Sequence, residues 1–287
     1  MTTAVTGQPS IRTLRSGELL RWWPVALIAL FVVAAIFAPL LAPYDPNSQN
    51  LIGRLRPPGT VSRAFHYWLG SDELGRDLLS RIIFGARASL VVAFASVILS
   101  GTFGVAAGMI AGYRRGWAEL VIMRVVDVFL SIPAILLAII TVAVLGPGLL
   151  NVIVVLALTR WPRYARVAYG QTLVVANMPF VRLSTLMGAS VWRVLGIHIL
   201  PNIIGAVSVV ATLEFGLMVL FEAGLSFLGL GVQPPTASWG AMLSTGRNYI
   251  AYAWWVATFP GLSLFLLVLA VNLIGDTVRD RLDPRAQ

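Results

Sequence analysis

The chain has 287 residues, of which 58% are hydrophobic and only 11% are charged, and its mean hydropathy is +0.84. Soluble domains carry about 25% charged residues, so this composition excludes an ordinary soluble domain and indicates a protein dissolved mainly in a lipid bilayer. All 21 basic residues are arginine and cysteine is absent, which excludes a P-loop lysine, a Schiff base, a cysteine nucleophile, iron–sulfur ligation and disulfides. The net charge is +9, but the arginines are scattered between apolar runs, so membrane topology explains them better than nucleic-acid binding does.

The chain begins with an arginine-containing stretch that precedes a long apolar run. We assign residues 1–21 to a cytoplasmic arm, and residues 22–87 to a first transmembrane helix (22–43) followed by an extracytoplasmic segment. The apolar run is longer than the roughly 7–15 residues of a signal-peptide core, so we expect it to remain uncleaved.

Residues 88–276 are expected to form the rest of the membrane-embedded core, because a helix needs about 20 apolar residues to cross the hydrocarbon. A long uncharged window is divided at Gly146-Pro147-Gly148, where a turn is expected. The window 223–246 contains Gly229 and Pro234-Pro235 and is expected to be an exposed or re-entrant connection. The remaining windows predict five further spans, at 88–113, 119–145, 149–170, 200–223 and 252–276. The fold class predicted is therefore an all-α integral membrane protein with six transmembrane helices and a tail at 277–287.

Arginine is distributed unevenly between the two sides of this topology. With the N-terminus inside, two thirds of the 21 basic residues lie in cytoplasmic segments, as the retention of positive charge on that side requires. We therefore expect both the N-terminus and the C-terminus to be cytoplasmic.

The second span carries small residues at every fourth position, which places them on one face of a helix. Such a face allows another backbone to approach closely, either within the same bundle or at a dimer seam. The residues are Ser96, Ser100, Gly104, Gly108 and Gly112.

Three acidic residues lie inside predicted spans, where a charge must face protein or water. Asp127 follows Arg124 by three residues, so the two are expected to pair on one face. Glu214 and Glu222 lie on the same face as Met218. They form either an acidic stripe along the translocation path or polar contacts to a neighbouring helix or partner chain, and the sequence favours neither.

Catalytic and metal-binding patterns are not expected in this chain. His66 and His198 are the only histidines, and neither has the spacing of a metal site. A serine–histidine dyad is not excluded by counting, but His198 lies in an arginine-rich cytoplasmic segment that is poorly placed for chemistry on a buried bond. We expect no catalytic residues, no metal and no cofactor bound by the chain itself.

The segment 160–202 is predicted to contain two short helices joined at Gly188. Asn177 is expected to cap the first helix at Met178-Pro179, and Ser190 to cap a second helix that ends before Pro201. An apolar surface of this size usually meets another protein, although it could fold back onto its own helices or the membrane. Its residues are Phe180, Leu183, Leu186, Met187, Val191, Trp192 and Leu195.

Five blocks of the sequence resemble one protein family. Residues 182–190, followed by His198-Ile199-Leu200-Pro201-Asn202, resemble the EAA loop of permeases from ABC importers. The other blocks are similar to the C-subunit type of dipeptide and oligopeptide permeases. They are 69–87, 161–171, 222–240 and 272–285.

This resemblance implies the type I ABC importer permease fold, in a multi-pass subunit of the bacterial cytoplasmic (inner) membrane in contact with lipid. The implied partners are a homologous permease chain, two ATPase subunits or a fused pair that hold ATP and Mg, an extracytoplasmic binding protein and a peptide substrate. The EAA coupling loop, at about 176–200, would contact the ATPases. Its implied coupling residues are Phe180, Arg182, Leu183, Leu186, Met187, Gly188, Ala189, Ser190 and Trp192.

The sequence departs from the family pattern at several positions. Arg182, Leu183 and Ser184 stand where the motif name gives glutamate and alanines, which implies a matched ATPase groove. His198 occupies a position that is usually aliphatic, and Glu214 corresponds to no family motif.

Three alternative functions are weighed against a peptide permease. The same machinery could carry another cargo, such as a nickel chelate or longer oligopeptides. A transporter driven by an ion gradient would use Asp127, Glu214 and Glu222 as relays, but it would not need the solvent-facing apolar surface at 180–195. An intramembrane hydrolase lacks a convincing set of catalytic residues.

Overall fold

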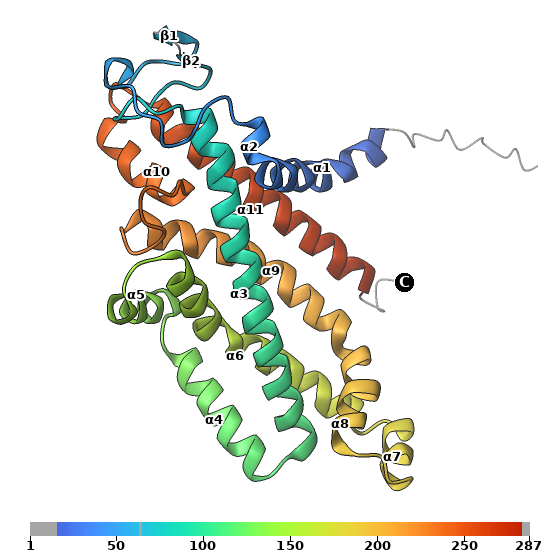
Figure 1. Cartoon of the computed structure of the whole chain (residues 1–287). Helices are drawn as coiled ribbons and strands as arrows, with labels where there is room; N and C mark the ends of the chain where they lie inside the picture. The colour runs from blue at the N-terminus through green and yellow to red at the C-terminus, as the bar shows by residue number, and fades with distance from the viewer. Residues whose placement is uncertain (1–15, 63–64, 283–287) are drawn as a thin grey trace, which may run out of the picture.

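The structure is a computed structural model that describes residues 16–62 and 65–282 (Figure 1). Nearly all of its regular structure is helical. The longer elements are α1 (Ser16–Ile36), α3 (Leu78–Arg114), α4 (Trp117–Ser131), α5 (Ala134–Leu145), α6 (Leu149–Val175), α9 (Leu200–Phe227) and α11 (Trp255–Leu282). The shorter elements are α2 (Ala38–Leu41), η1 (Leu51–Gly53), β1 (Thr60–Ser62), β2 (Phe65–Tyr67), α7 (Pro179–Leu186), α8 (Val191–Arg193), the π-helix η2 (Val194–Ile199), α10 (Trp239–Gly246) and η3 (Arg247–Tyr249).

Helix α3 is the central element of the bundle and runs along most of its length (Figure 1). It packs most extensively against α6, through the stripe of small residues. A Cβ atom on Gly104 or Gly108 would overlap the backbone carbonyl of Trp161 or Ala165. The small residues therefore pack within this chain, which was one of the two alternatives, because glycine lets the two helix backbones approach closely.

The all-α membrane fold is confirmed, whereas the count of six spans is confirmed only in part. In the described part of the chain, three helices are long and apolar enough to cross a bilayer: Leu78–Arg114, Val191–Phe227 and Trp255–Asp280. Helices α4 and α5 add a fourth span if the bent pair is counted as one. The apolar part of α1, Trp22–Ile36, is too short to count as a span. Helix α6 carries three arginines around its middle, at positions 160, 163 and 166, and is not among the helices counted as spans.

Two predicted helix boundaries differ from the structure for identifiable reasons. Helix α3 begins at Leu78 rather than at residue 88, because the Asp77 carboxylate caps it by accepting a hydrogen bond from the backbone N–H of Ser80 at 2.8 Å. The predicted helix 119–145 is broken between α4 and α5, which meet at 93°. Pro133 causes the break, because it lacks an N–H donor and restricts the residue before it.

The connection after α9, predicted to be exposed or re-entrant, is exposed at residues 228–229 and 233–236 but folds back onto the bundle on either side of the second stretch. The Trp239 side chain, at the start of α10, is buried and donates a hydrogen bond from Nε1 to the carbonyl of Ile82 on α3 at 3.0 Å. A Cβ on Gly240 would overlap the backbone of Ala223 on α9, so only glycine allows α10 to pack this closely.

The second short helix does not end before Pro201, as the sequence suggested. Helix α8 continues through η2 into α9, so that Val191–Phe227 is one continuous helical segment of 37 residues. Pro201 lies in the first turn of α9, directly after the π-helical turn. Proline cannot donate a backbone hydrogen bond, but at this position the cost to the helix is small, because the π-helical turn has already altered the regular hydrogen-bond pattern.

The segment between α2 and α3 folds into a small unit, which we call the cap segment (residues 42–62 and 65–77). Strands β1 and β2 pair antiparallel, with Thr60 opposite Tyr67. Trp255 of α11 donates a hydrogen bond from Nε1 to the carbonyl of Ser71 at 3.2 Å, which ties the cap segment to the bundle. Figure 1 shows the cap segment at one end of α3 and helices α7 and α8 at the other.

Candidate functional site

Helices α7 and α8 and the turn between them present a group of large apolar side chains that the described residues leave exposed. We call this group the apolar end surface; it comprises Phe180, Leu183, Leu186, Met187 and Trp192. Leu186 is 84% exposed and Met187 is 81% exposed. Leu195 is buried among the residues of α9 instead, so its predicted place in the exposed surface is wrong. Val191 is only partly buried against the same core.

The two short helices are fixed to the bundle by a few specific contacts. Gly188 joins them with a φ of +84°, a conformation that a residue with a side chain rarely adopts. Ser184 Oγ and His198 Nε2 lie 3.0 Å apart and connect α7 to η2. Val181 packs into a core cluster with residues of η2 and α9. The apolar end surface is therefore held on a rigid support rather than on a free loop.

Of the two predicted N-cap residues, Asn177 is wrong, whereas Ser190 occupies the predicted position without a side-chain hydrogen bond. Met178, not Asn177, is the N-cap of α7. The Asn177 amide instead donates to the carbonyl of Leu173 at 2.7 Å and accepts from Arg182 at 3.0 Å. Ser190 is the N-cap of α8, but its side chain makes no capping hydrogen bond. Arg182 and Arg193 make this end of the molecule positively charged.

Asp127 pairs with a different arginine from the one expected. Its carboxylate forms an ion pair with Arg166 of α6, and both side chains are about half-exposed. Arg124 lies nearby, on the wall of a cavity of about 340 Å³ between α4 and α6, but it is not the partner. The i, i+3 prediction failed because the facing helix α6 supplies a cation that lies closer.

Glu214 is buried and bound to α6. Its side chain is 2% exposed, and Oε2 lies 3.0 Å from Nε of Arg160, whose side chain is 5% exposed. The two atoms are not aligned for a hydrogen bond, so the contact is an ion pair. Arg163 lies 3.5 Å from the other carboxylate oxygen, and the Arg160 guanidinium stacks over the ring of Phe221 at 4.5 Å.

Glu222 is buried as well, and no cation accompanies it in the described residues. Its two oxygens accept hydrogen bonds from Ser89 of α3 and Ser226 of α9, both at 2.8 Å. Ser226 Oγ also accepts from the backbone N–H of Val232, which ties the connection after α9 to this point. For both glutamates, the structure shows the predicted alternative of a contact to a neighbouring helix: α6 for Glu214 and α3 for Glu222.

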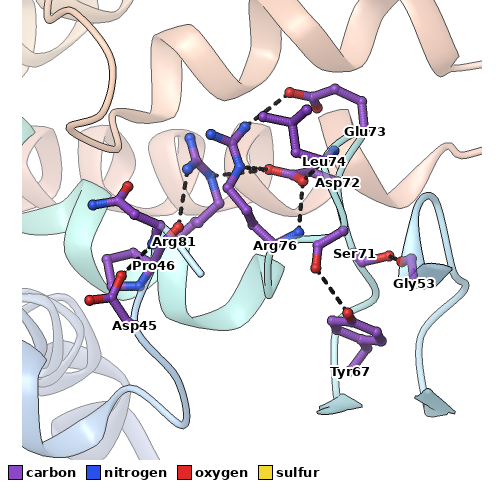
Figure 2. Close-up of polar contacts among 12 residues, drawn as sticks. Asp45, Pro46, Gly53, Tyr67, Ser71, Asp72, Glu73, Leu74, Arg76 and Arg81 are labelled. Carbon is purple, nitrogen blue, oxygen red and sulfur yellow. Dashed lines mark hydrogen bonds and ion pairs between the residues drawn. The ribbon is translucent and has the colours of Figure 1, made fainter. Parts of the chain in front are cut away.

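A polar network in the cap segment escaped the sequence analysis. Figure 2 shows Arg76 and Arg81 converging on Asp72, with Nε–Oδ2 distances of 2.6 Å and 3.4 Å. Arg81 also donates to the carbonyl of Pro46 at 3.2 Å. Burial raises the pKa of Glu73, although Arg76 pairs with it at 2.9 Å. The alternation of acids and arginines over residues 72–81 is the signal that could have revealed this network.

In the part of the chain that the structure describes, no group of three or more histidine or acidic side chains is arranged to hold a metal ion. The serine–histidine contact at Ser184 and His198 links two helices, and neither residue has an acid hydrogen-bonded to it. What distinguishes this end of the molecule is its group of exposed large apolar side chains.

The sequence of residues 104–287 matches the family described as the binding-protein-dependent transport system inner membrane component. The chain belongs to this family. Residues 25–58 of the permease also match the N-terminal transmembrane domain of oligopeptide transport permease C.

The permease is similar to several bacterial transport proteins. It is 46% identical to the di/tripeptide transport system permease protein DppC of Pseudomonas aeruginosa, over 89% of this chain and 85% of that protein. It is 41% identical to the probable D,D-dipeptide transport system permease protein DdpC of Escherichia coli, over 91% and 86% of the two chains. It is 42% identical to the glutathione transport system permease protein GsiD of Pectobacterium atrosepticum, over 90% and 84%.

The fold of the permease is similar to that of an ABC transporter solved in an inward-facing conformation. The match is to a chain of the MetNI methionine ABC transporter, with a TM-score of 0.56 and 22% sequence identity, over 71% of this chain and 96% of the other. This similarity confirms the predicted permease fold. The resemblance to the peptide-permease branch is confirmed by the sequence relatives.

Proposed function

We propose that this permease forms, together with a homologous permease chain, the path by which an ATP-driven importer moves di- and oligopeptides across the bacterial cytoplasmic membrane. Membership of the binding-protein-dependent family supports the importer, and the names of the relatives support a peptide as the cargo. An extracytoplasmic binding protein would deliver the peptide. The relatives do not favour a nickel chelate as cargo.

The observation that carries this proposal is the apolar end surface. An exposed group of large apolar side chains at one end of a membrane bundle requires a protein partner. We assign that partner to the ATPase subunits, as two chains or one fused pair. The ATPases would hold ATP and Mg, because this chain has no lysine to form a P-loop.

The coupling contact would use Phe180, Arg182, Leu183, Leu186, Met187, Gly188, Ala189, Ser190 and Trp192. Leu186, Met187 and Trp192 are the most exposed of the large side chains among them. We place this surface, the N-terminus and the C-terminus in the cytoplasm. The domain boundaries follow: an arm at 1–21, a first helix with extracytoplasmic segment at 22–87, a core at 88–276 and a tail at 277–287.

The continuous segment Val191–Phe227 gives this proposal a mechanical basis. Trp192 lies at one end of the segment, and Glu222, which is tied to α3, lies near the other. A displacement of the coupling helices by closing ATPases would be carried along one helix to the connection after Phe227. Rigid-body motion of this kind is how packed helices transmit a change between two states.

The test is a charge placed on the apolar end surface, with a matched control. We expect Met187→Asp to abolish co-purification of the permease with its ATPases and to lower ATP-dependent dipeptide uptake into proteoliposomes at least tenfold, because a carboxylate would be buried without a partner. Val61→Asp adds the same charge at an apolar position of β1 that is 67% exposed, and it should leave assembly unchanged.

The result that contradicts the proposal is a Met187→Asp variant that assembles and transports like wild type. Uptake that needs an ion gradient and no ATP would contradict it as well. Uptake of a nickel chelate but not of a dipeptide would preserve the importer and overturn the cargo.

A further inference from the structure

Two cavities meet at Arg87, outside the coupling surface and the buried polar network. The first has a volume of about 470 Å³ and is lined by the cap segment, α3 and the connection before α10, including Asp45, Arg87, Val91 and Thr236. The second is an apolar groove of about 540 Å³ between α1 and α3. Arg87 and Val91 line both, so the two cavities adjoin at these residues.

The guanidinium of Arg87 is exposed and makes no hydrogen bond or ion pair with any described residue. Asp45, on the wall of the same cavity, accepts a hydrogen bond from the backbone N–H of Asn47 at 2.7 Å but does not pair with Arg87. The cavity therefore offers one unpaired cation and one carboxylate to a ligand that carries both charges.

The position of Arg87 along α3 corresponds to the surface of the bilayer. Residues 88–113 carry no charge, and 26 residues of helix are about 39 Å long, which covers a hydrocarbon core of roughly 30 Å. Arg87 directly precedes this stretch, so it lies at the depth of the lipid phosphates. Arg114 lies at the opposite end of the same stretch.

The groove continues from Arg87 toward the middle of the bilayer. Its remaining wall is apolar and comes from Val32, Ala35 and Ile36 of α1 and from Leu90 and Phe94 of α3. Ile36 and Phe94 are exposed in the chain. A peptide has no long apolar chain to fill such a groove, whereas a lipid does.

We propose that Arg87 and the two cavities bind one phospholipid with a phosphoethanolamine head group. The phosphate lies on the Arg87 guanidinium, the ammonium lies toward Asp45, and one acyl chain follows the groove between α1 and α3. The charged cavity matches the zwitterionic head group, and the adjoining apolar groove matches the acyl chain. The site is independent of peptide transport, so its failure would leave the proposed function untouched.

The experiment is native mass spectrometry of the full-length chain, purified in detergent and freed of lipid. The chain is titrated with phosphatidylethanolamine, phosphatidylglycerol and phosphatidylcholine that carry the same acyl chains. We expect phosphatidylethanolamine to bind most tightly and Arg87→Ala to weaken its binding at least tenfold. Arg54→Ala removes an exposed arginine that lines neither cavity, and it should change the affinity less than twofold.

Two further variants separate the parts of the site. Val91→Trp fills the junction of the two cavities without changing the charge, and should weaken phosphatidylethanolamine binding at least tenfold even if Arg87→Ala does not fold. Asp45→Asn keeps an acceptor for Asn47 but removes the carboxylate. It should abolish the preference for phosphatidylethanolamine over phosphatidylglycerol.

Several outcomes would overturn the proposal. Equal lipid affinity in wild type, Arg87→Ala and Val91→Trp would show that the cavities do not bind lipid, and tighter binding of phosphatidylglycerol by wild type would overturn the head-group assignment. Binding of a dipeptide that depends on Arg87, without lipid binding, would make the first cavity a peptide site. Loss of pairing with a second permease chain in Arg87→Ala, with lipid affinity unchanged, would make the groove a subunit interface.

Discussion

Arg160 and Glu214 illustrate how a charge is tolerated at bilayer depth. Their side chains are 5% and 2% exposed, and each ion would cost several kcal/mol to bury alone. Their attraction offsets this cost only while both are present. Arg163 contributes less to the balance, because its side chain is 54% exposed and can be solvated.

Removing the charge of Glu214 alone should therefore lower the free energy of unfolding more than removing the charges of both Glu214 and Arg160. We expect Glu214→Gln to lower the free energy of unfolding by about 3–5 kcal/mol, because it leaves Arg160 buried without a counter-ion. The double variant Arg160→Met/Glu214→Gln should lose less than Glu214→Gln alone. Thermal unfolding of the solubilised chain measures both, with Arg163→Gln as the control that should change little. Additive losses in the double variant would show that the two charges are not coupled.

The sequence predicted where the buried acidic residues lie on their helices, but it did not predict which residues contact them. The sequence placed Glu214 and Glu222 on one face of one helix, which is correct. It could not supply Arg160 and Ser89, because these partners lie 54 and 133 positions away and come from other helices. Asp127 failed for the same reason, since a local arginine was outcompeted by Arg166 on the facing helix.

The contact between α3 and α6 sets the geometry of the bundle at the scale of elements. The small residues of α3 remove the side chains that would otherwise separate two helix backbones. Without a hydrophobic drive from water, close packing of this kind is what associates helices in lipid. The stripe could be recognised from the sequence, but the choice between a contact within the chain and one between chains required the structure.

Two glycines on α3 provide a matched test of this contact. A Cβ on Gly108 would lie 2.9 Å from Cβ of Ala168 on α6, whereas a Cβ on Gly101 would lie an ordinary 3.5 Å from the ring of Tyr164. We expect Gly108→Ala to destabilise the chain by about 1–3 kcal/mol through overpacking. Gly101→Ala should be neutral or stabilising by up to about 1 kcal/mol, because alanine favours a helix over glycine. Equal melting temperatures for the two variants would contradict the role of the stripe.

The structure as a whole separates two working ends. The cap segment lies at one end of α3 and the apolar end surface at the other (Figure 1). The proposed topology places the first outside the cell and the second in the cytoplasm. Because the chain contains no cysteine, each end can be labelled after a single substitution with no background from native thiols.

The labelling experiment uses Val61→Cys in β1 and Leu186→Cys in α7, both at exposed positions. In intact cells, we expect a membrane-impermeant maleimide to react with Val61→Cys and not with Leu186→Cys. Both should react after the membrane is permeabilised in cells that lack the ATPase subunits, which controls for accessibility without a partner covering Leu186. Labelling of Leu186→Cys from outside would reverse the proposed orientation.

The sequence by itself determined that this protein lies in a membrane, its all-α class, the position of its two short helices α7 and α8, and its family. These follow from local quantities: apolar length, glycine and proline positions, and motif spacing. The tertiary structure alone decided which helices break, where α3 begins, that α8 continues into α9, and which arginine neutralises which acid. It also brought Asp45 and Arg87 to one cavity. These features depend on contacts between residues far apart in the chain, and the energy of such a contact is not encoded in either segment alone.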